Sequence, residues 1–195
     1  MVQFLRKENR GVIVSAVVLL AVVIYLVTLS IMQQRDKQDI KAVCESFVQE
    51  DALWRVLPVD YEGGAVRISD EEMDQFQSDL TDALSTYFIE NDAAIDNSLS
   101  ILYTQLENQN DGFEPLATGF DSAIVKYTDF SFDGSNVKVT FDMQIAVESV
   151  YPSDGNSTPS RTSTKVSNQI TLQKVDGEWK IVYVYISKEN TGGMY

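Results

Sequence analysis

An uninterrupted apolar stretch near the N-terminus constrains this chain more than any other feature. Residues 11–32 contain no charged side chain, and their only polar side chains are Ser15, Tyr25, Thr28 and Ser30. At a rise of about 1.5 Å per residue, a helix of this length is roughly 33 Å long, enough to cross a hydrocarbon core of about 30 Å. We therefore expect a transmembrane helix over residues 11–32.

The charges on the two sides of this stretch are opposite in sign. Residues 1–10 carry three basic side chains and one acidic side chain, whereas residues 33–195 carry 12 basic and 28 acidic ones, a net charge of −16. Basic residues close to a membrane helix favour its cytoplasmic side. Arg35, Lys37 and Lys41 oppose this rule but are diluted by neighbouring aspartates. We expect a single-pass protein of the cell membrane, with residues 1–10 as a cytoplasmic tail and an extracytoplasmic C-terminal domain.

The composition excludes several classes of function. A strongly acidic domain argues against a nucleic-acid partner, because phosphate binding needs a basic surface. The chain has no histidine and a single cysteine, Cys44, so it has no histidine-based triad and no thiolate metal cluster. It also lacks a glycine-rich phosphate loop. We expect no catalytic, cofactor-binding or metal-binding residue, no cofactor, and no enzyme activity.

Two features that resemble binding sites have simpler interpretations. Cys44 recurs at helical spacing with apolar residues, which favours a buried free thiol over an intermolecular disulfide. The acidic residues from Asp70 to Asp74 could offer oxygen ligands to calcium, but calcium needs a loop that wraps around it. Ser69 followed by Glu72 instead fits a capping box at the start of a helix, where acidic residues are favourable.

Helical periodicity follows the apolar stretch. Residues 33–57 are predicted to form a stalk and the first helix of the domain, because no proline or glycine interrupts them before Pro58. A second helix follows Ser69, and a third ends near residues 108–112. The apolar positions that carry the three patterns are Ile40, Val43, Cys44, Phe47, Val48, Trp54, Met73, Phe76, Leu80, Leu84, Tyr87, Phe88, Ile95, Leu99, Leu102 and Leu106.

The apolar period then changes from the helical value to two, which indicates β-strands. Helices followed by an antiparallel meander predict an α+β fold, in which about three helices pack on a four-stranded antiparallel sheet. The remainder of the domain is expected over residues 58–188, followed by a loose C-terminal tail over residues 189–195. The predicted strands cover residues 123–132, 137–148, 166–172 and 178–186, with turns at 133–136 and 176–177 and a polar loop at 152–163.

This element order resembles the cone-shaped α+β roll shared by nuclear transport factor, ketosteroid isomerase and cystatin-like domains. The turn at Asp176-Gly177, followed by a strand that begins Glu178-Trp179, is similar to the ending common in that superfamily. The resemblance covers about residues 38–188. With its single membrane helix, the chain also resembles the bitopic assembly-factor subunit of type IV secretion and conjugation systems. That resemblance implies a scaffold that binds other channel subunits, and it assigns no functional residue.

Two sets of residues are candidates for a site. Trp179, Tyr183 and Tyr185 are expected on one face of the last strand, where they form either an exposed interaction face or a face buried against the helices. Tyr127 and Asp129 are two residues apart on one predicted strand and are therefore expected on the same face. Rolls of the ketosteroid isomerase type pair an aspartate base with a tyrosine donor inside the cone, but a wet aspartate beside a half-buried tyrosine is the simpler interpretation.

These observations favour a membrane-anchored extracytoplasmic scaffold or assembly protein, as in a bacterial conjugation or type IV secretion-like envelope complex. Its expected partners are the membrane, other envelope proteins and a further copy of itself. The alternative is an envelope-anchored roll that binds a small molecule or peptide in its cone. An isomerase-like or dehydratase-like enzyme using Tyr127 and Asp129 is the third hypothesis.

Overall fold

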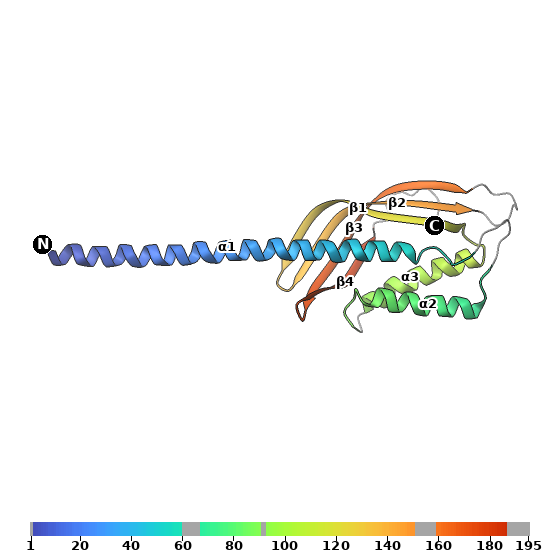
Figure 1. Ribbon diagram of the computed structural model, residues 1–195, viewed down its shortest axis with the longest axis horizontal. Coiled ribbons are helices and arrows are strands. Elements are labelled where there is room, and N and C mark those ends of the chain that lie inside the picture. The colour runs from blue at the N-terminus through green and yellow to red at the C-terminus, as the bar shows by residue number, and fades with distance from the viewer. Residues whose placement is uncertain (1, 60–66, 91–92, 151–158, 187–195) are drawn as a thin grey trace. The chain divides into compact units, whose positions relative to one another are not determined.

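The computed structural model describes residues 2–59, 67–90, 93–150 and 159–186, with the backbone alone at residues 2–13, 94 and 186 (Figure 1). Two compact units make up the chain, Met1–Asp39 and Ile40–Tyr195. The expected C-terminal tail over residues 189–195 and most of the polar loop at 152–163 lie outside the described residues.

The first unit is helical throughout its described residues. Helix α1 spans Val2–Leu53, so the predicted membrane stretch and the predicted first helix of the domain belong to one element. Among the described residues, α1 holds the one stretch that is long and apolar enough to cross a membrane, with a mean hydropathy of 2.7 and no buried residue. Apolar side chains that no other part of the protein covers need a non-aqueous environment. The apolar stretch therefore has the properties of a membrane anchor.

The second unit begins with the last turns of α1. Ile40, Cys44, Phe47 and Val48 are spaced by four, three and one residues, so they lie on one face of the helix, and all four are buried. This face packs into the domain core. Cys44 is a buried free thiol, as its helical spacing predicted.

Helix α2 (Asp70–Ser85) begins at the predicted capping box. The Ser69 backbone N–H donates to Glu72 Oε2 over 2.8 Å, and the Glu72 N–H donates to Ser69 Oγ over 3.3 Å. The Ser69 backbone N–H, and then the Ser69 hydroxyl, which also donates to Glu72 Oε2 over 2.8 Å, lower the pKa of Glu72. Because the folded state prefers the charged carboxylate, this stabilisation is present above the unfolded pKa of Glu72 and is lost as the pH falls through its folded value.

Helix α3 (Ala93–Asn110) leads into the sheet through a turn at Gly112, whose φ is +77°. Strands β1 (Leu116–Asp133), β2 (Asn136–Val150), β3 (Ser160–Val175) and β4 (Glu178–Ile186) follow. They form one antiparallel sheet in the order β1-β2-β3-β4 (Figure 1). The predicted α+β order is confirmed.

The first strand is longer than the sequence pattern predicted. It begins at Leu116 rather than near residue 123, and it pairs with β2 from Leu116 opposite Val150. Three β-bulges leave Thr118, Val125 and Thr128 without a partner of their own, which is why 18 residues of β1 pair with 15 residues of β2. Each bulge interrupts the alternation of apolar and polar residues that reveals a strand in a sequence.

The core lies between one face of the sheet and the three helices. On β2, Val137, Val139, Phe141 and Met143 alternate inward and are at most 6 % exposed. Phe47 of α1 makes edge-to-face contacts with Tyr87 and Phe88, with ring centroids 5.7 Å apart in both pairs. The other buried apolar side chains of this core are Ile40, Cys44, Val48, Leu57, Ile68, Met73, Leu80, Leu84, Leu99, Leu102, Leu106, Leu116, Val150, Val166, Ile170, Leu172, Trp179 and Ile181.

The capping box predicts that two serine-to-alanine substitutions, one at the N-cap of α2 and one inside the helix, have different effects on stability. Replacing Ser69 by alanine should lower the free energy of unfolding by about 1 kcal/mol, because it removes an N-cap hydrogen bond. The matched change Ser78→Ala, at an exposed position inside the same helix, should raise it by a few tenths of a kcal/mol, because alanine is the better helix former. Urea unfolding of the full-length protein in detergent measures both, and equal effects would contradict the assigned cap.

Burial of Cys44, and then the charge of Glu45, raises the pKa of the thiol from 9.0 to about 12. A thiol reagent at pH 8 should leave the folded protein unlabelled and should label the denatured chain at once. Above about pH 9 the unfolded chain loses this proton and the folded protein keeps it, so stability should fall by up to about 1.4 kcal/mol per pH unit. The Cys44→Ala variant should lack that part of the pH dependence, and an identical slope in both proteins would contradict the burial.

Candidate functional site

The predicted aromatic face on β4 is not a single face. Trp179 is buried, whereas Tyr183 and Tyr185 are 47 % and 51 % exposed. Ile181 pairs with Leu172 and Tyr183 pairs with Thr171, which leaves Val182 as a bulged residue without its own partner on β3. The bulge reverses the alternation, so Trp179 faces the core and the two tyrosines face outward. The expectation that all three share a face was wrong.

A bulge also separates the second predicted pair. Tyr127 lies opposite Phe141 on the buried face, and Thr128 has no partner of its own, so Asp129 lies opposite Thr140 and is exposed. Phe130, rather than Asp129, is the inward neighbour of Tyr127, with ring centroids 5.5 Å apart. The expectation that Tyr127 and Asp129 share a face was also wrong.

Tyr127 has a structural role in the described residues. Its hydroxyl lies 3.2 Å from both the Lys41 carbonyl oxygen and Glu45 Oε1, and the Lys41 ammonium lies 4.9 Å from the ring centroid. Burial, followed by the charges of Cys44 and Glu45, raises the pKa of Tyr127. The tyrosine therefore stays protonated and joins α1 to β1, whereas Asp129, the base that the isomerase hypothesis assigned, faces away from it.

The segment between α2 and α3 covers part of the β4 edge. Phe88 forms a parallel bridge with Ile181: the Ile181 N–H donates to the Tyr87 carbonyl over 2.7 Å, and the Ile89 N–H donates to the Ile181 carbonyl over 3.3 Å. Lys180 Nζ adds a hydrogen bond of 3.0 Å to the Thr86 carbonyl at the end of α2. We call residues 87–89 the strap. It holds the end of α2 against β4.

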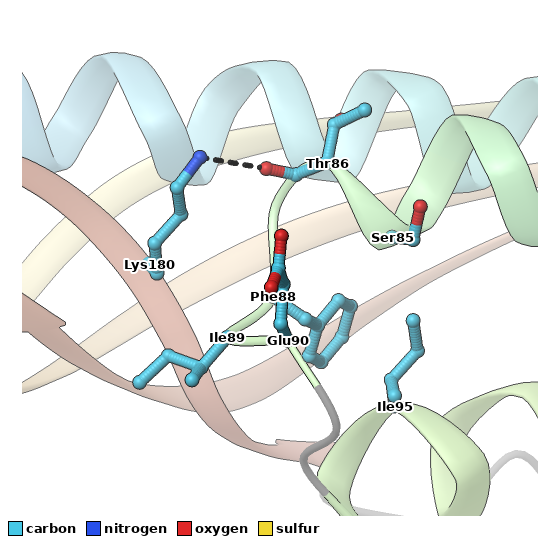
Figure 2. Close-up of a pocket in the computed structure, with 7 residues that line it drawn as sticks. All are labelled: Ser85, Thr86, Phe88, Ile89, Glu90, Ile95 and Lys180. Carbon is cyan, nitrogen blue, oxygen red and sulfur yellow. Dashed lines mark hydrogen bonds between the residues drawn. The ribbon is translucent and has the colours of Figure 1, made fainter. Parts of the chain in front are cut away.

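An open hollow of about 490 Å³ lies beside the strap. Figure 2 shows Lys180 of β4 on one side of it and Ile95 of α3 on the other, with Phe88 between them. The remaining lining residues are Ser85, Thr86, Ile89 and Glu90. Lys180 also pairs with Glu178 at 3.1 Å, so its charge is already engaged. The hollow is a shallow, mixed surface at the sheet edge rather than the interior of the cone.

The helical layer beside this edge is acidic. Helix α2 carries six aspartate and glutamate residues and α3 carries two, and neither helix contains lysine or arginine. Helix α3 packs against β4. Among the described residues, no group of three or more potential ligands is placed to hold a metal ion. The helical parts that reach the edge strand, α3 and the C-terminal end of α2, therefore carry acidic and no basic side chains.

The sequence did not reveal the strap or the bulges. Residues 87–89 look like the end of the second helical pattern, because Tyr87 and Phe88 continue its apolar spacing. A bulge depends on the partner strand, which no local pattern shows. One signal was available in the sequence. Residues 181–186 carry no charged side chain, so they lack the alternation of apolar and polar residues that a regular half-exposed strand shows.

No family model and no curated protein matches the chain. Solved structures do match, at low sequence identity. An NTF2-like protein of unknown function from Shewanella oneidensis MR-1 is 10 % identical, with 78 % of this chain and 99 % of that chain covered and a TM-score of 0.39. CagV, a VirB8 homolog of the T4SS from Helicobacter pylori strain 26695, is 14 % identical, with coverages of 76 % and 99 % and a TM-score of 0.43.

A periplasmic fragment of TraM is 16 % identical, with coverages of 77 % and 96 % and a TM-score of 0.39. An NTF2-like protein and a T4SS protein thus both occur among the similar structures. At these identities the likeness concerns the α+β fold alone.

The bulge at Val182 predicts that truncating Trp179 and truncating Tyr185, both on β4, have unequal effects on stability. Trp179→Ala should lower the free energy of unfolding by about 3–5 kcal/mol, because it empties a buried site. Tyr185→Ala should lower it by less than about 1 kcal/mol, because half of that side chain already contacts water. Chemical unfolding of both variants measures the difference. Similar losses would mean that the two residues share a face after all.

Proposed function

We propose that this protein is a membrane-anchored extracytoplasmic scaffold, a component of a bacterial conjugation or type IV secretion-like envelope complex. The observation that carries the proposal is α1. Its apolar stretch has no covering partner among the described residues, and its last turns supply Ile40, Cys44, Phe47 and Val48 to the domain core. Anchor and folded domain therefore share one helix, which suits a protein that holds a domain close to a membrane surface.

The charge asymmetry of the chain supports the proposed orientation. The basic residues at 1–10 favour the cytoplasmic side, and the domain with its net charge of −16 lies on the other side. An acidic domain of this kind is repelled by anionic lipid headgroups. It is therefore suited to protein partners above the membrane rather than to the membrane surface.

The arrangement of the side chains favours binding over catalysis. The inward face of β2 and β3 is filled by Val139, Phe141, Ile170 and Leu172, each at most 1 % exposed. Tyr127 is engaged by α1, and Asp129 faces the other way. We accordingly propose a domain that performs no catalytic step and that works through its outer surfaces.

A second candidate function is the binding of a small molecule or peptide at the domain surface. The observation that favours it is the hollow beside the strap, where the apolar side chains of Phe88, Ile89 and Ile95 meet Glu90 and Lys180. A rise in melting temperature of the full-length protein with a small-molecule ligand, abolished by Ile95→Asp, would favour this function over the scaffold.

Native purification tests the scaffold proposal. The full-length protein, isolated from its own membranes in mild detergent, should bring envelope proteins with it in a fixed ratio. The control is Phe141→Ala, which should cost about 3–5 kcal/mol of domain stability and leave α1 in the membrane. Envelope proteins that co-purify by binding the folded domain should be absent when this variant is purified. A protein that purifies alone, or companions that remain with the variant, would contradict the proposal.

A further inference from the structure

The outer edge of β4 is open beyond Ile181. Strand β4 ends the sheet, and among the described residues its outer edge forms backbone hydrogen bonds only at Ile181, with the strap. The following residues, 182–186, have no such partner there. An unpaired strand edge presents N–H and C=O groups that can pair with another extended chain. The structure therefore leaves about five residues of backbone at this edge for strand addition.

The two edges of the sheet differ in how well they accept another strand. On β1, the bulges at Thr118, Val125 and Thr128 break the regular spacing of the backbone groups, and bulges protect an edge from pairing. Residues 182–186 contain no charge and no proline, which are the other common means of protecting an edge. Beyond the bulge at Val182, the β4 edge is regular. It is the more suitable of the two edges for a partner strand.

The surroundings of this edge define the chemistry of its partner. On the outer face, Tyr183 and Tyr185 are about half exposed and offer aromatic surface to apolar side chains. On the inner side, β4 packs against α3, which carries two carboxylates and no basic residue. The strap joins β4 to the C-terminal end of α2, whose last two turns carry Asp79 and Asp82 and no basic residue. An added strand presents alternate side chains to these two sides. Apolar side chains suit the tyrosines, and basic side chains suit the acidic helices.

We propose that residues 182–186 of β4 bind an extended, basic segment of a partner protein by strand addition. This inference rests on the proposed scaffold function and names the surface and the kind of partner. The same charges disfavour a second copy of this chain as the occupant. Pairing two β4 edges would bring together two acidic helical layers from domains that each carry a net charge of −16.

Site-specific crosslinking in native membranes tests the location. A photo-reactive benzoylphenylalanine replaces Tyr183 or Tyr185 in the full-length chain, a change from one aromatic residue to another. The controls carry it at Val125 on the β1 edge or Ile101 on α3, which are 56 % and 64 % exposed. We expect at least about tenfold more adduct at the β4 positions than at the controls, formed with one partner through a segment rich in lysine or arginine.

Synthetic copies of the crosslinked segment then test the backbone pairing. N-methylation of alternate amides removes the hydrogen bonds of one strand edge and leaves those of the other. We expect one of the two N-methylated copies to bind the detergent-solubilised protein like the parent peptide, and the other to bind at least about tenfold more weakly. Replacing the basic residues of the peptide by glutamine should weaken binding and reduce its dependence on salt.

The following outcomes of the crosslinking and peptide experiments would overturn the inference. Adducts with a second copy of this chain, with its own residues 187–195 or with an acidic segment would identify a different occupant. No excess of adduct at β4, or equal binding by both N-methylated copies, would show that the edge does not pair. If native purification nevertheless yields envelope partners, the scaffold function stands and only the docking surface is wrong. If it yields none, the scaffold proposal itself has failed.

Discussion

The packing of the last turns of α1 against the sheet is the interaction on which the rest of the domain depends. Ile40 and Cys44 are fully buried on this helix, and Phe47 joins it to the aromatic residues of the strap. The Ser122 hydroxyl of β1 donates to the Val48 carbonyl over 2.8 Å. Each buried apolar side chain of this kind contributes about 1.5–3 kcal/mol. Without these turns of α1, the part of the inner face that they cover would be exposed to water, so residues 40–53 of this helix belong to the folded domain.

The β-bulges decide which side chains this core receives and which face outward. Because the side chains of a strand alternate with a period of two, one extra residue moves every later side chain to the opposite face. At Thr128 the bulge moves Asp129 out of the environment of Tyr127. At Val182 it turns Tyr183 and Tyr185 outward while Trp179 stays inside. The bulge on β1 thus separates a potential catalytic pair, and the bulge on β4 creates an exposed aromatic surface.

Much of the fold follows from the sequence, because its elements are specified locally. The apolar stretch, the capping box at Ser69, the burial of Cys44 and the order of helices and strands each depend on residues close together in the chain. The start of β1 at Leu116 could not be found in this way, since its polar residues and its first bulge hide the period of two. The strap could not be found either, because its partner at Ile181 is far along the chain.

The candidate site was less predictable than the fold for the same physical reason. The grouping of Trp179 with Tyr183 and Tyr185, and of Tyr127 with Asp129, relied on unbroken alternation along β4 and β1. Whether a strand is bulged depends on the geometry of its partner strand and on the helix that packs over it. A surface defined by an edge, such as residues 182–186, also requires knowledge of which strand ends the sheet.

Hydrogen exchange at the backbone amides of α1 tests the central claim most directly. If residues 44–53 belong to the domain core, their amides in the full-length protein should exchange as slowly as those of β2 between Val137 and Met143, through the same global unfolding. Amides in α1 that exchange much faster than those of β2, with the strands still protected, would contradict the account. That result would reduce the end of α1 to a linker between a membrane anchor and a domain that folds without it.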